Sequence, residues 1–152
     1  MKICVGASAG GHMNELFGIL EYSKQWPAQP SIYITTQVLL AEKLKKKGKT
    51  YVIGECNRYH PFEAIKIIFL GIYIFLKDKP DVVVTTGSMP IAMICLVAKL
   101  FRKKVVWIDS IASTTKFSAS GRLIYPFADL FLTQWPELAE KYKKAEYAGA
   151  VL

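Results

Sequence analysis

The sequence has too little of several features to belong to some common classes of protein. Only three of its 152 residues are cysteines, and Cys4, Cys56 and Cys95 lack C-x-x-C spacing, so we expect reduced, structural thiols in a cytosolic protein. The longest apolar run, residues 67–76, is about half of the ~20 residues that cross a bilayer. Lys2 is followed at once by a short strand and a glycine loop, so we expect no signal peptide.

Acidic residues are also in the minority. The chain has 12 Asp and Glu against 20 Lys and Arg, a net charge of +8, and the surplus is concentrated in residues 42–49, 99–104 and 140–144. Two explanations of these basic runs are equally good: they are solvated helix ends, or they bind an anionic surface, which is either a membrane or a nucleic acid. We expect no nucleic-acid partner, because no RNA- or DNA-binding motif is recognisable and the aromatic residues are not interleaved with the lysines.

What the sequence does have is a regular alternation of apolar, β-branched runs with longer helical patterns. The expected strands are residues 2–6, 31–35, 50–54, 81–85, 104–108 and 129–133, with a possible short strand at 145–148. The expected helices are residues 12–25, 37–47, 61–77, 89–101, 120–126 and 136–143. Because most strands are continuously apolar, this order predicts an α/β fold with a Rossmann-like, doubly wound parallel sheet, and we expect one domain over residues 1–152.

Ligands of such sheets bind beside the carboxyl ends of the strands, where the first loop is rich in glycine. This loop is not a dinucleotide fingerprint, because Ser8 stands where a glycine should be, and it is not a P-loop, because His12 replaces the lysine. Gly10 and Gly11 instead expose backbone N–H groups at a helix N-terminus, which attracts an anionic oxygen, with His12 at the mouth. Alternatively, the glycines only permit a tight turn and His12 is a polar first-turn residue.

The later loops at this edge of the sheet carry weaker signals. The strand–glycine–helix design is repeated after the fourth strand by Gly87, Ser88 as an N-cap and Pro90 at the first helical position, so the two glycine loops should face each other. Asp109 follows the fifth strand, where it is either a general base or a group that orients its loop. Trp135 follows the sixth strand.

The segment 61–77 has almost no face suited to water. One glutamate and one lysine alone interrupt its apolar residues before Lys77, and a small domain can rarely bury such a helix on all sides. We therefore favour contact with a membrane surface or a partner over a fully buried helix. The expected membrane contacts are Lys66, Phe69, Ile72 and Tyr73.

Five segments together resemble a known family over nearly the whole chain. They are residues 6–16, 79–90, 105–113, 121–138 and 147–152. The most specific part is "ADLFLTQWPEL", whereas the glycine–glycine–histidine motif is shared with MurG-like transferases in general. The chain resembles the membrane-associated subunit of two-part glycosyltransferases, represented by asparagine-linked glycosylation protein fourteen in eukaryotes and by PssD-type exopolysaccharide proteins in bacteria.

The resemblance implies a fold equivalent to the N-terminal, acceptor-binding half of a GT-B glycosyltransferase. A separate PssE-type subunit would bind the UDP-sugar, and the pair would transfer its sugar to a polyprenyl-diphosphate-linked sugar acceptor. The chain would be inactive alone and would recruit its partner to the cytoplasmic face of the cell membrane as a peripheral protein. We expect no counterpart here to the N-terminal membrane helix of the eukaryotic members, so anchoring would rest on the segment 61–77 and on basic residues. We expect no cofactor and no metal site.

The family also implies roles for individual residues. His12 and Asp109 match catalytic positions, although Asp109 stands where the family is expected to have glutamate. The positions that would bind the acceptor diphosphate are Ser8, Gly10, Gly11, Gly87 and Ser88. The expected partner interface consists of Trp135, Tyr147, Val151 and Leu152. The alternative to this whole reading is a self-sufficient, Rossmann-type nucleotide-binding enzyme.

Overall fold

The computed structural model describes residues 1–57 and 59–151, whose strands form one seven-stranded sheet with parallel pairing throughout. The order is β3-β2-β1-β4-β5-β6-β7, so the chain reverses direction across the sheet between β1 and β4, as a doubly wound fold requires. The strands are β1 (Ile3–Ala7), β2 (Pro30–Thr35), β3 (Lys49–Val52), β4 (Val82–Thr85), β5 (Lys104–Ile108), β6 (Leu130–Thr133) and β7 (Ala145–Tyr147).

The helices fall between the strands as expected, but several end earlier than expected, among them the helix predicted over residues 37–47, which ends at Leu44. The helices are α1 (Gly11–Leu20), α2 (Val38–Leu44), α3 (Pro61–Lys77), α4 (Met89–Leu100), α5 (Ala119–Ile124) and α6 (Pro136–Lys141). The helix expected to reach residue 25 ends at Leu20, because the chain turns through a short 3-10 helix to an extended Trp26, a conformation that the following proline favours. The last helix stops at Lys141, because Tyr142 is extended and its ring packs 4.2 Å from that of Phe117.

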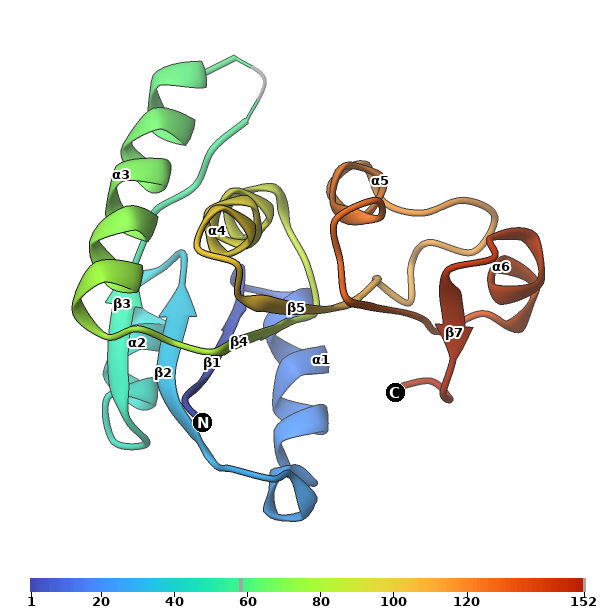
Figure 1. The fold of residues 1–152 in the computed structure, drawn as a ribbon, viewed down its shortest axis with the longest axis horizontal. Coiled ribbons are helices and arrows are strands. Elements are labelled where there is room, and N and C mark those ends of the chain that lie inside the picture. Colours follow the sequence, from blue (N-terminus) through green and yellow to red (C-terminus); the bar gives the residue numbers. More distant parts are fainter. Residues whose placement is uncertain (58, 152) are drawn as a thin grey trace.

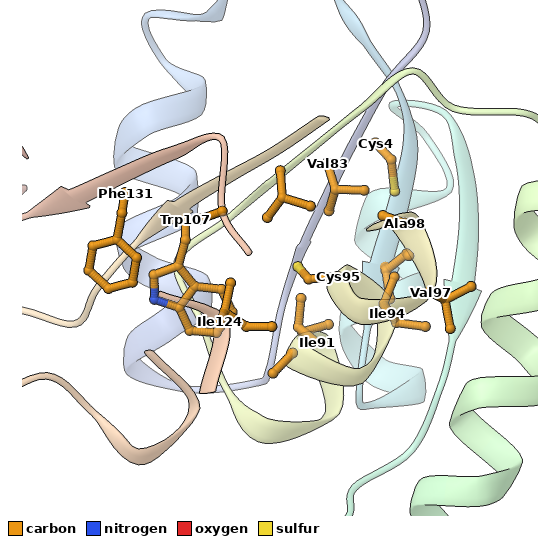
Figure 2. Packing of buried hydrophobic residues seen from close by; sticks show 14 of the residues in the cluster. Cys4, Val83, Ile91, Ile94, Cys95, Val97, Ala98, Trp107, Ile124 and Phe131 are labelled. Carbon is orange, nitrogen blue, oxygen red and sulfur yellow. The ribbon is translucent and has the colours of Figure 1, made fainter. Parts of the chain in front are cut away.

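The two faces of the sheet are covered unequally (Figure 1). On one face α3, α4 and α5 enclose the main core, in which Trp107 and Phe131 lie beside Ile91, Ile94 and Ile124 (Figure 2). Cys4 and Cys95 lie in this core as well, and burial raises the pKa of both thiols. On the other face α1 and α2 cover a smaller cluster centred on β1.

Part of the second face is left open. Four of its strand residues are only half-buried, and we call them the open strip: Val82, Val106, Leu130 and Leu132. They line a cavity of about 460 Å³ together with Ile19 and Trp26. Ile19 at the end of α1 borders this cavity, but the four strand side chains stay only half-buried, which leaves apolar surface that another molecule could cover.

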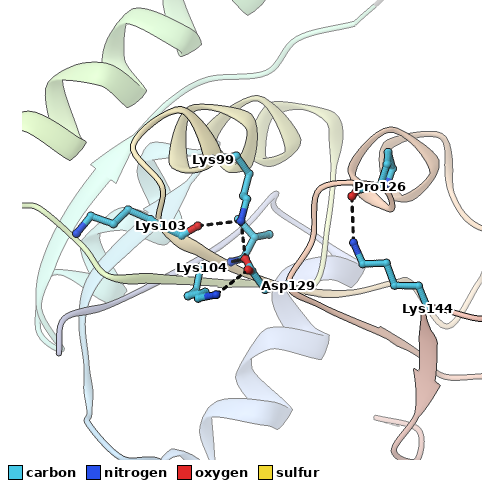
Figure 3. Close-up of polar contacts among 7 residues, drawn as sticks. Lys99, Lys103, Lys104, Pro126, Asp129 and Lys144 are labelled. Carbon is cyan, nitrogen blue, oxygen red and sulfur yellow. Dashed lines mark hydrogen bonds and ion pairs between the residues drawn. The ribbon is translucent and has the colours of Figure 1, made fainter.

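Asp129 fastens the covered face at the start of β6 (Figure 3). Its carboxylate accepts hydrogen bonds from Lys99 Nζ at 2.8 Å, from Lys104 Nζ at 3.0 Å and from the backbone N–H of Val105 at 2.8 Å. Partial burial alone would raise the pKa of Asp129, but these three donors outweigh it and lower the pKa to about 2. The end of α4 and the start of β5 are thus tied to β6 by one carboxylate.

Candidate functional site

The two glycine loops meet at the carboxyl ends of β1 and β4. His12 Nδ1 lies 2.9 Å from the carbonyl oxygen of Thr86, and Thr86 Oγ1 donates a hydrogen bond to the carbonyl oxygen of His12. A Cβ added to Gly87 would lie in van der Waals contact with the imidazole, 3.5 Å from His12 Cε1, so Gly87 lies directly beside this ring. The structure therefore brings together the two loops that the sequence pattern placed opposite each other.

The contact with Thr86 fixes how the imidazole of His12 is protonated when it is neutral. A carbonyl oxygen can only accept a hydrogen bond, so Nδ1 carries the hydrogen and donates it to Thr86. The lone pair is then on Nε2, and the side chain is half-exposed at the mouth of the loop. His12 can therefore accept a proton from a bound hydroxyl group through Nε2.

Gly10 and Gly11 are glycines for different reasons. Gly10 has a φ of 91°, which other residues rarely adopt, and its carbonyl oxygen accepts the bond from Asn14 that begins α1. Gly11 has no such constraint, and a Cβ at this position would meet nothing within 4 Å. The turn therefore explains Gly10, whereas Gly11 keeps the space above the first turn of α1 open. Ser8, earlier in the loop, is 8% exposed.

Ser88 occupies the N-cap position of α4, but it does not cap the helix with its side chain as the sequence predicted. Its hydroxyl oxygen is buried and has no hydrogen-bond partner among the described residues. Its φ of 107° lies in the region that favours glycine, and Gly87 before it has a φ of 110°. The second loop is thus held in a conformation that capping alone does not explain.

Asp109 is enclosed by the loop that follows it. It is 1% exposed, and its carboxylate accepts hydrogen bonds from Trp107 Nε1 at 3.1 Å and from the N–H and hydroxyl of Ser118 at 2.9 and 2.6 Å. A Cβ on Gly121 would clash with Oδ1 of the same carboxylate, so α5 packs directly on it. This geometry fits the orienting role better than the general-base role, which needs contact with a substrate.

Glu15 and Gln134 were missed by the sequence analysis. Glu15 lies on α1, and its carboxylate accepts hydrogen bonds from Ser110 Oγ at 3.3 Å and from Gln134 Nε2 at 3.1 Å. Both side chains are buried, at 9% and 4% exposure. Glu15 is the carboxylate inside the opening motif and Gln134 is the amide of the "QWPE" motif, but neither position shows its partner in the sequence.

The expected membrane residues all lie on α3, and all but one of them are exposed. Five large side chains form an exposed stripe along this helix, which we call the α3 stripe: Phe62, Ile65, Phe69, Tyr73 and Leu76. Lys66 is exposed beside it and pairs with Glu63 at 2.7 Å. Ile72 is half-buried and packs on the main core, so it presents less surface to a membrane than the residues of the α3 stripe. In the part of the chain that the structure describes, no helix is long and apolar enough to cross a bilayer.

The expected partner residues differ in their surroundings. Trp135 is half-buried against the main core and donates its indole N–H to the carbonyl oxygen of Ile111 at 2.7 Å. Tyr147 is 48% exposed. Val151 is half-buried, and its N–H donates to Gln134 Oε1 at 2.8 Å, whereas Leu152 lies outside the described residues.

Comparison with solved structures identifies the fold class. Acinetobacter baumannii MurG superposes with a TM-score of 0.73 at 18% identity, over 89% of this chain and 42% of the MurG chain. At this identity the likeness shows the fold alone. The expected fold class is confirmed: a Rossmann-like, doubly wound sheet equivalent to one half of a GT-B glycosyltransferase, so the chain spans less than half of that solved structure.

Comparison with known sequences extends over nearly the whole chain. The UDP-N-acetylglucosamine transferase subunit ALG14 of Yarrowia lipolytica is 29% identical over 99% of this chain and 81% of its own length. The subunit of the same name from Candida albicans is 35% identical over 99% of this chain and 78% of its own length. Residues 49–151 match the family described as "Oligosaccharide biosynthesis protein Alg14 like". The chain belongs to this Alg14 family, as its five sequence segments predicted.

Proposed function

We propose that this chain is the acceptor-binding subunit of a two-part glycosyltransferase that acts in the synthesis of lipid-linked oligosaccharides or polysaccharides. The observation that carries the proposal is membership of the Alg14 family, whose relatives are named as UDP-N-acetylglucosamine transferase subunits. UDP-N-acetylglucosamine is accordingly the proposed donor, and a polyprenyl-diphosphate-linked sugar is the proposed acceptor. The fold supports a division of labour, because the chain corresponds to less than half of MurG.

The proposed acceptor site is the junction of the two glycine loops. The N-termini of α1 and α4 both present backbone N–H groups there, which favours a diphosphate. The proposed diphosphate contacts are Ser8, Gly10, Gly11, Gly87 and Ser88. As the acceptor oxygen bonds to the anomeric carbon of the donor sugar and UDP leaves, Nε2 of His12 takes the proton of that hydroxyl group. Asp109 holds the neighbouring loop in place.

The proposed attachment to the cytoplasmic face of the membrane uses the α3 stripe and nearby lysines. Phe62, Phe69 and Leu76 are 75%, 68% and 60% exposed, which is unfavourable in water. Each such side chain contributes about 1.5–3 kcal/mol when it is buried, and each lysine near an anionic leaflet contributes about 1 kcal/mol. The helix would lie on the surface of the bilayer, with Lys66 at the level of the headgroups.

The proposed partner is a PssE-type subunit that binds the UDP-sugar. The open strip is a better candidate for its docking surface than Trp135, whose indole is already engaged. Ile19 and Trp26 line both the cavity over the strip and a second cavity that reaches Val151. The open strip, Ala150 and Val151 therefore form one continuous surface. A stable complex would bury about 1,200–2,000 Å² in total on the two partners.

The test is reconstitution of sugar transfer with a PssE-type partner. The isolated chain should neither bind UDP-N-acetylglucosamine by calorimetry nor transfer sugar, whereas the co-expressed pair should co-purify and be active. His12→Ala should lower the rate of the pair ~10²-fold, the usual scale for a positioned acid–base group. The matched control is His60→Ala, because His60 is the other histidine and lies exposed before α3.

Two outcomes would contradict the proposal. Tight donor binding or sugar transfer by the chain without a partner would favour the self-sufficient nucleotide-binding enzyme. A fully active His12→Ala pair between pH 6 and pH 8 would show that the imidazole has a structural role only.

A further inference from the structure

A chain of buried polar contacts joins the C-terminal segment to α1. The amide of Gln134 accepts a hydrogen bond from the N–H of Val151 at 2.8 Å, and it donates to Glu15 Oε2 at 3.1 Å and to the carbonyl oxygen of Asp109 at 3.0 Å. These three residues come from the C-terminal segment, from α1 and from the loop after β5. One side chain therefore connects segments that are far apart in the sequence.

Every polar atom of this amide is used, which makes its position sensitive to each partner. Gln134 is 4% exposed, so losing one partner would leave a buried polar group unsatisfied rather than hydrated. Glu15 in turn receives hydrogen bonds from Ser110 Oγ and from the N–H of Ile111, at 3.3 and 3.4 Å. A change at the C-terminal segment is thus transmitted to a carboxylate one turn beyond Gly11 on α1.

Packing supports the same connection. A Cβ on Gly18 would come within 2.7 Å of Val151 Cγ1, so the C-terminal segment lies directly on α1. Val151, Gly11 and Glu15 also line one cavity of about 350 Å³, together with Asn14 and Ile111. The C-terminal segment therefore forms one wall of the space that borders the first turn of α1.

We propose that Gln134 is a positioning residue, which couples the placement of residues 149–151 to the first turn of α1 through Glu15. With the segment in place, Gln134 holds Glu15, and Glu15 fixes the turn that carries Gly11 and His12. When the segment is displaced, this turn loosens. The coupling is a property of the isolated chain. For sugar transfer it implies that the acceptor loop is ordered only when the C-terminal segment is held in place, and this consequence rests on the proposed function.

The first test removes one donor. Val151→Pro eliminates the N–H that Gln134 accepts, whereas Val151→Ala keeps it and serves as the matched control. The reporter is hydrogen exchange of the Asn14 amide, which donates to Gly10 and begins α1. Loss of about 1 kcal/mol should speed this exchange about fivefold in the proline variant, and the ring ¹⁵N shifts of His12 should move. The alanine variant should resemble the unchanged protein.

The second test reverses the contact between the two side chains. Gln134→Glu places a carboxylate against Glu15 and should speed Asn14 exchange by ~10-fold or more, because two like charges would then share one buried site. Adding Glu15→Gln restores a donor–acceptor pair between the two side chains but not the hydrogen bond to the carbonyl oxygen of Asp109, so the double variant should exchange more slowly than Gln134→Glu alone without returning fully to the unchanged protein. Exchange of the Cys95 amide, inside α4, should stay constant in all variants.

Three outcomes would overturn the coupling. The first is an exchange rate of the Asn14 amide that stays the same in Val151→Pro and also in Gln134→Glu. The second is a double variant no better than Gln134→Glu alone. The third is equal acceleration at Cys95, which would indicate general loss of stability. In a reconstituted pair, Val151→Pro should lower kcat more than it raises the KM for the acceptor. If the pair containing the unchanged chain is inactive, the proposed function is contradicted, but the result of the exchange experiment still stands.

Discussion

The two faces of the sheet have different tasks. The face under α3, α4 and α5 contains 22 buried core residues among those described, against nine on the face under α1 and α2. The first face is closed, and its outer surface carries the α3 stripe. The second face is only partly covered and ends in the open strip. Apolar surface is thus exposed on both sides, but on opposite sides of the sheet, which allows two different contacts at the same time.

This comparison shows why hydrophobic composition alone does not locate a binding surface. The chain is 52% hydrophobic, and the same residue types fill the core, the α3 stripe and the open strip. What separates them is how completely the rest of the described chain covers them. Each prediction below therefore compares residues of similar chemistry from the two faces.

The largest effect is expected from neighbouring residues on β6. Phe131 is 0% exposed in the main core, whereas Leu132 points to the other face and is half-buried. Phe131→Ala should lower the free energy of unfolding by about 3–5 kcal/mol, because it leaves a cavity among closely packed side chains. Leu132→Ala should cost about 1 kcal/mol, because less contact is lost. Urea denaturation of both variants measures the difference, and equal losses would mean that the second face is as closed as the first.

The next effect separates the two apolar surfaces by function. Phe62→Ser with Phe69→Ser should weaken binding to anionic vesicles ~10²-fold, as two exposed aromatic side chains are removed, and high salt should weaken it further. Association with the PssE-type partner should not change. Leu132→Ser should do the reverse, with partner affinity at least ~10-fold lower and unchanged vesicle binding.

Sedimentation with vesicles and pull-down with the partner check both surfaces on the same samples. The comparison of faces would be wrong if either variant impaired both contacts to the same degree. Equal binding to neutral vesicles at every salt concentration, unchanged by Phe62→Ser with Phe69→Ser, would contradict the proposed attachment through the α3 stripe and nearby lysines.

Much of the fold could be read from the sequence because the deciding signals are local. The bounds of α3 were predicted without error, since Pro61 begins the helix and the apolar run ends at Lys77. The partial burial of Ile72 was not predicted, because the helix packs around Gly71, where a Cβ would lie 3.1 Å from Ile94 on α4. That contact depends on how two helices cross, which a helical pattern does not contain.

The candidate site also has a part that the sequence predicts and a part that it does not. The glycine loops were predicted because strand, glycine and helix follow one another along the chain. Glu15 and Gln134 were not, because they lie 119 residues apart and neither has an unusual local pattern. Likewise, the two alternatives for Asp109 could be weighed only when its donors, Trp107 and Ser118, were placed around it.

The smallest effect tests how the covered face is fastened. Asp129→Asn removes the negative charge that Lys99 and Lys104 share, and it should cost about 1.5 kcal/mol at pH 7, the low end for hydrogen bonds to charged groups, because the side chain is 26% exposed. The folded-state pKa of about 2 lies below the ordinary value near 3.9, so this contribution is fully present above about pH 5 and is lost as the pH falls toward 2. Urea denaturation between pH 3 and pH 7 should show the free energies of unfolding of the two proteins converging as the pH falls.

The control is Glu42→Gln, which breaks only an exposed pair with Lys45 and should change the free energy of unfolding by less than about 0.5 kcal/mol at every pH. A gap between Asp129→Asn and the unchanged protein that stays constant down to pH 3 would show that the amide disturbs packing, and that the carboxylate does not hold α4, β5 and β6 together.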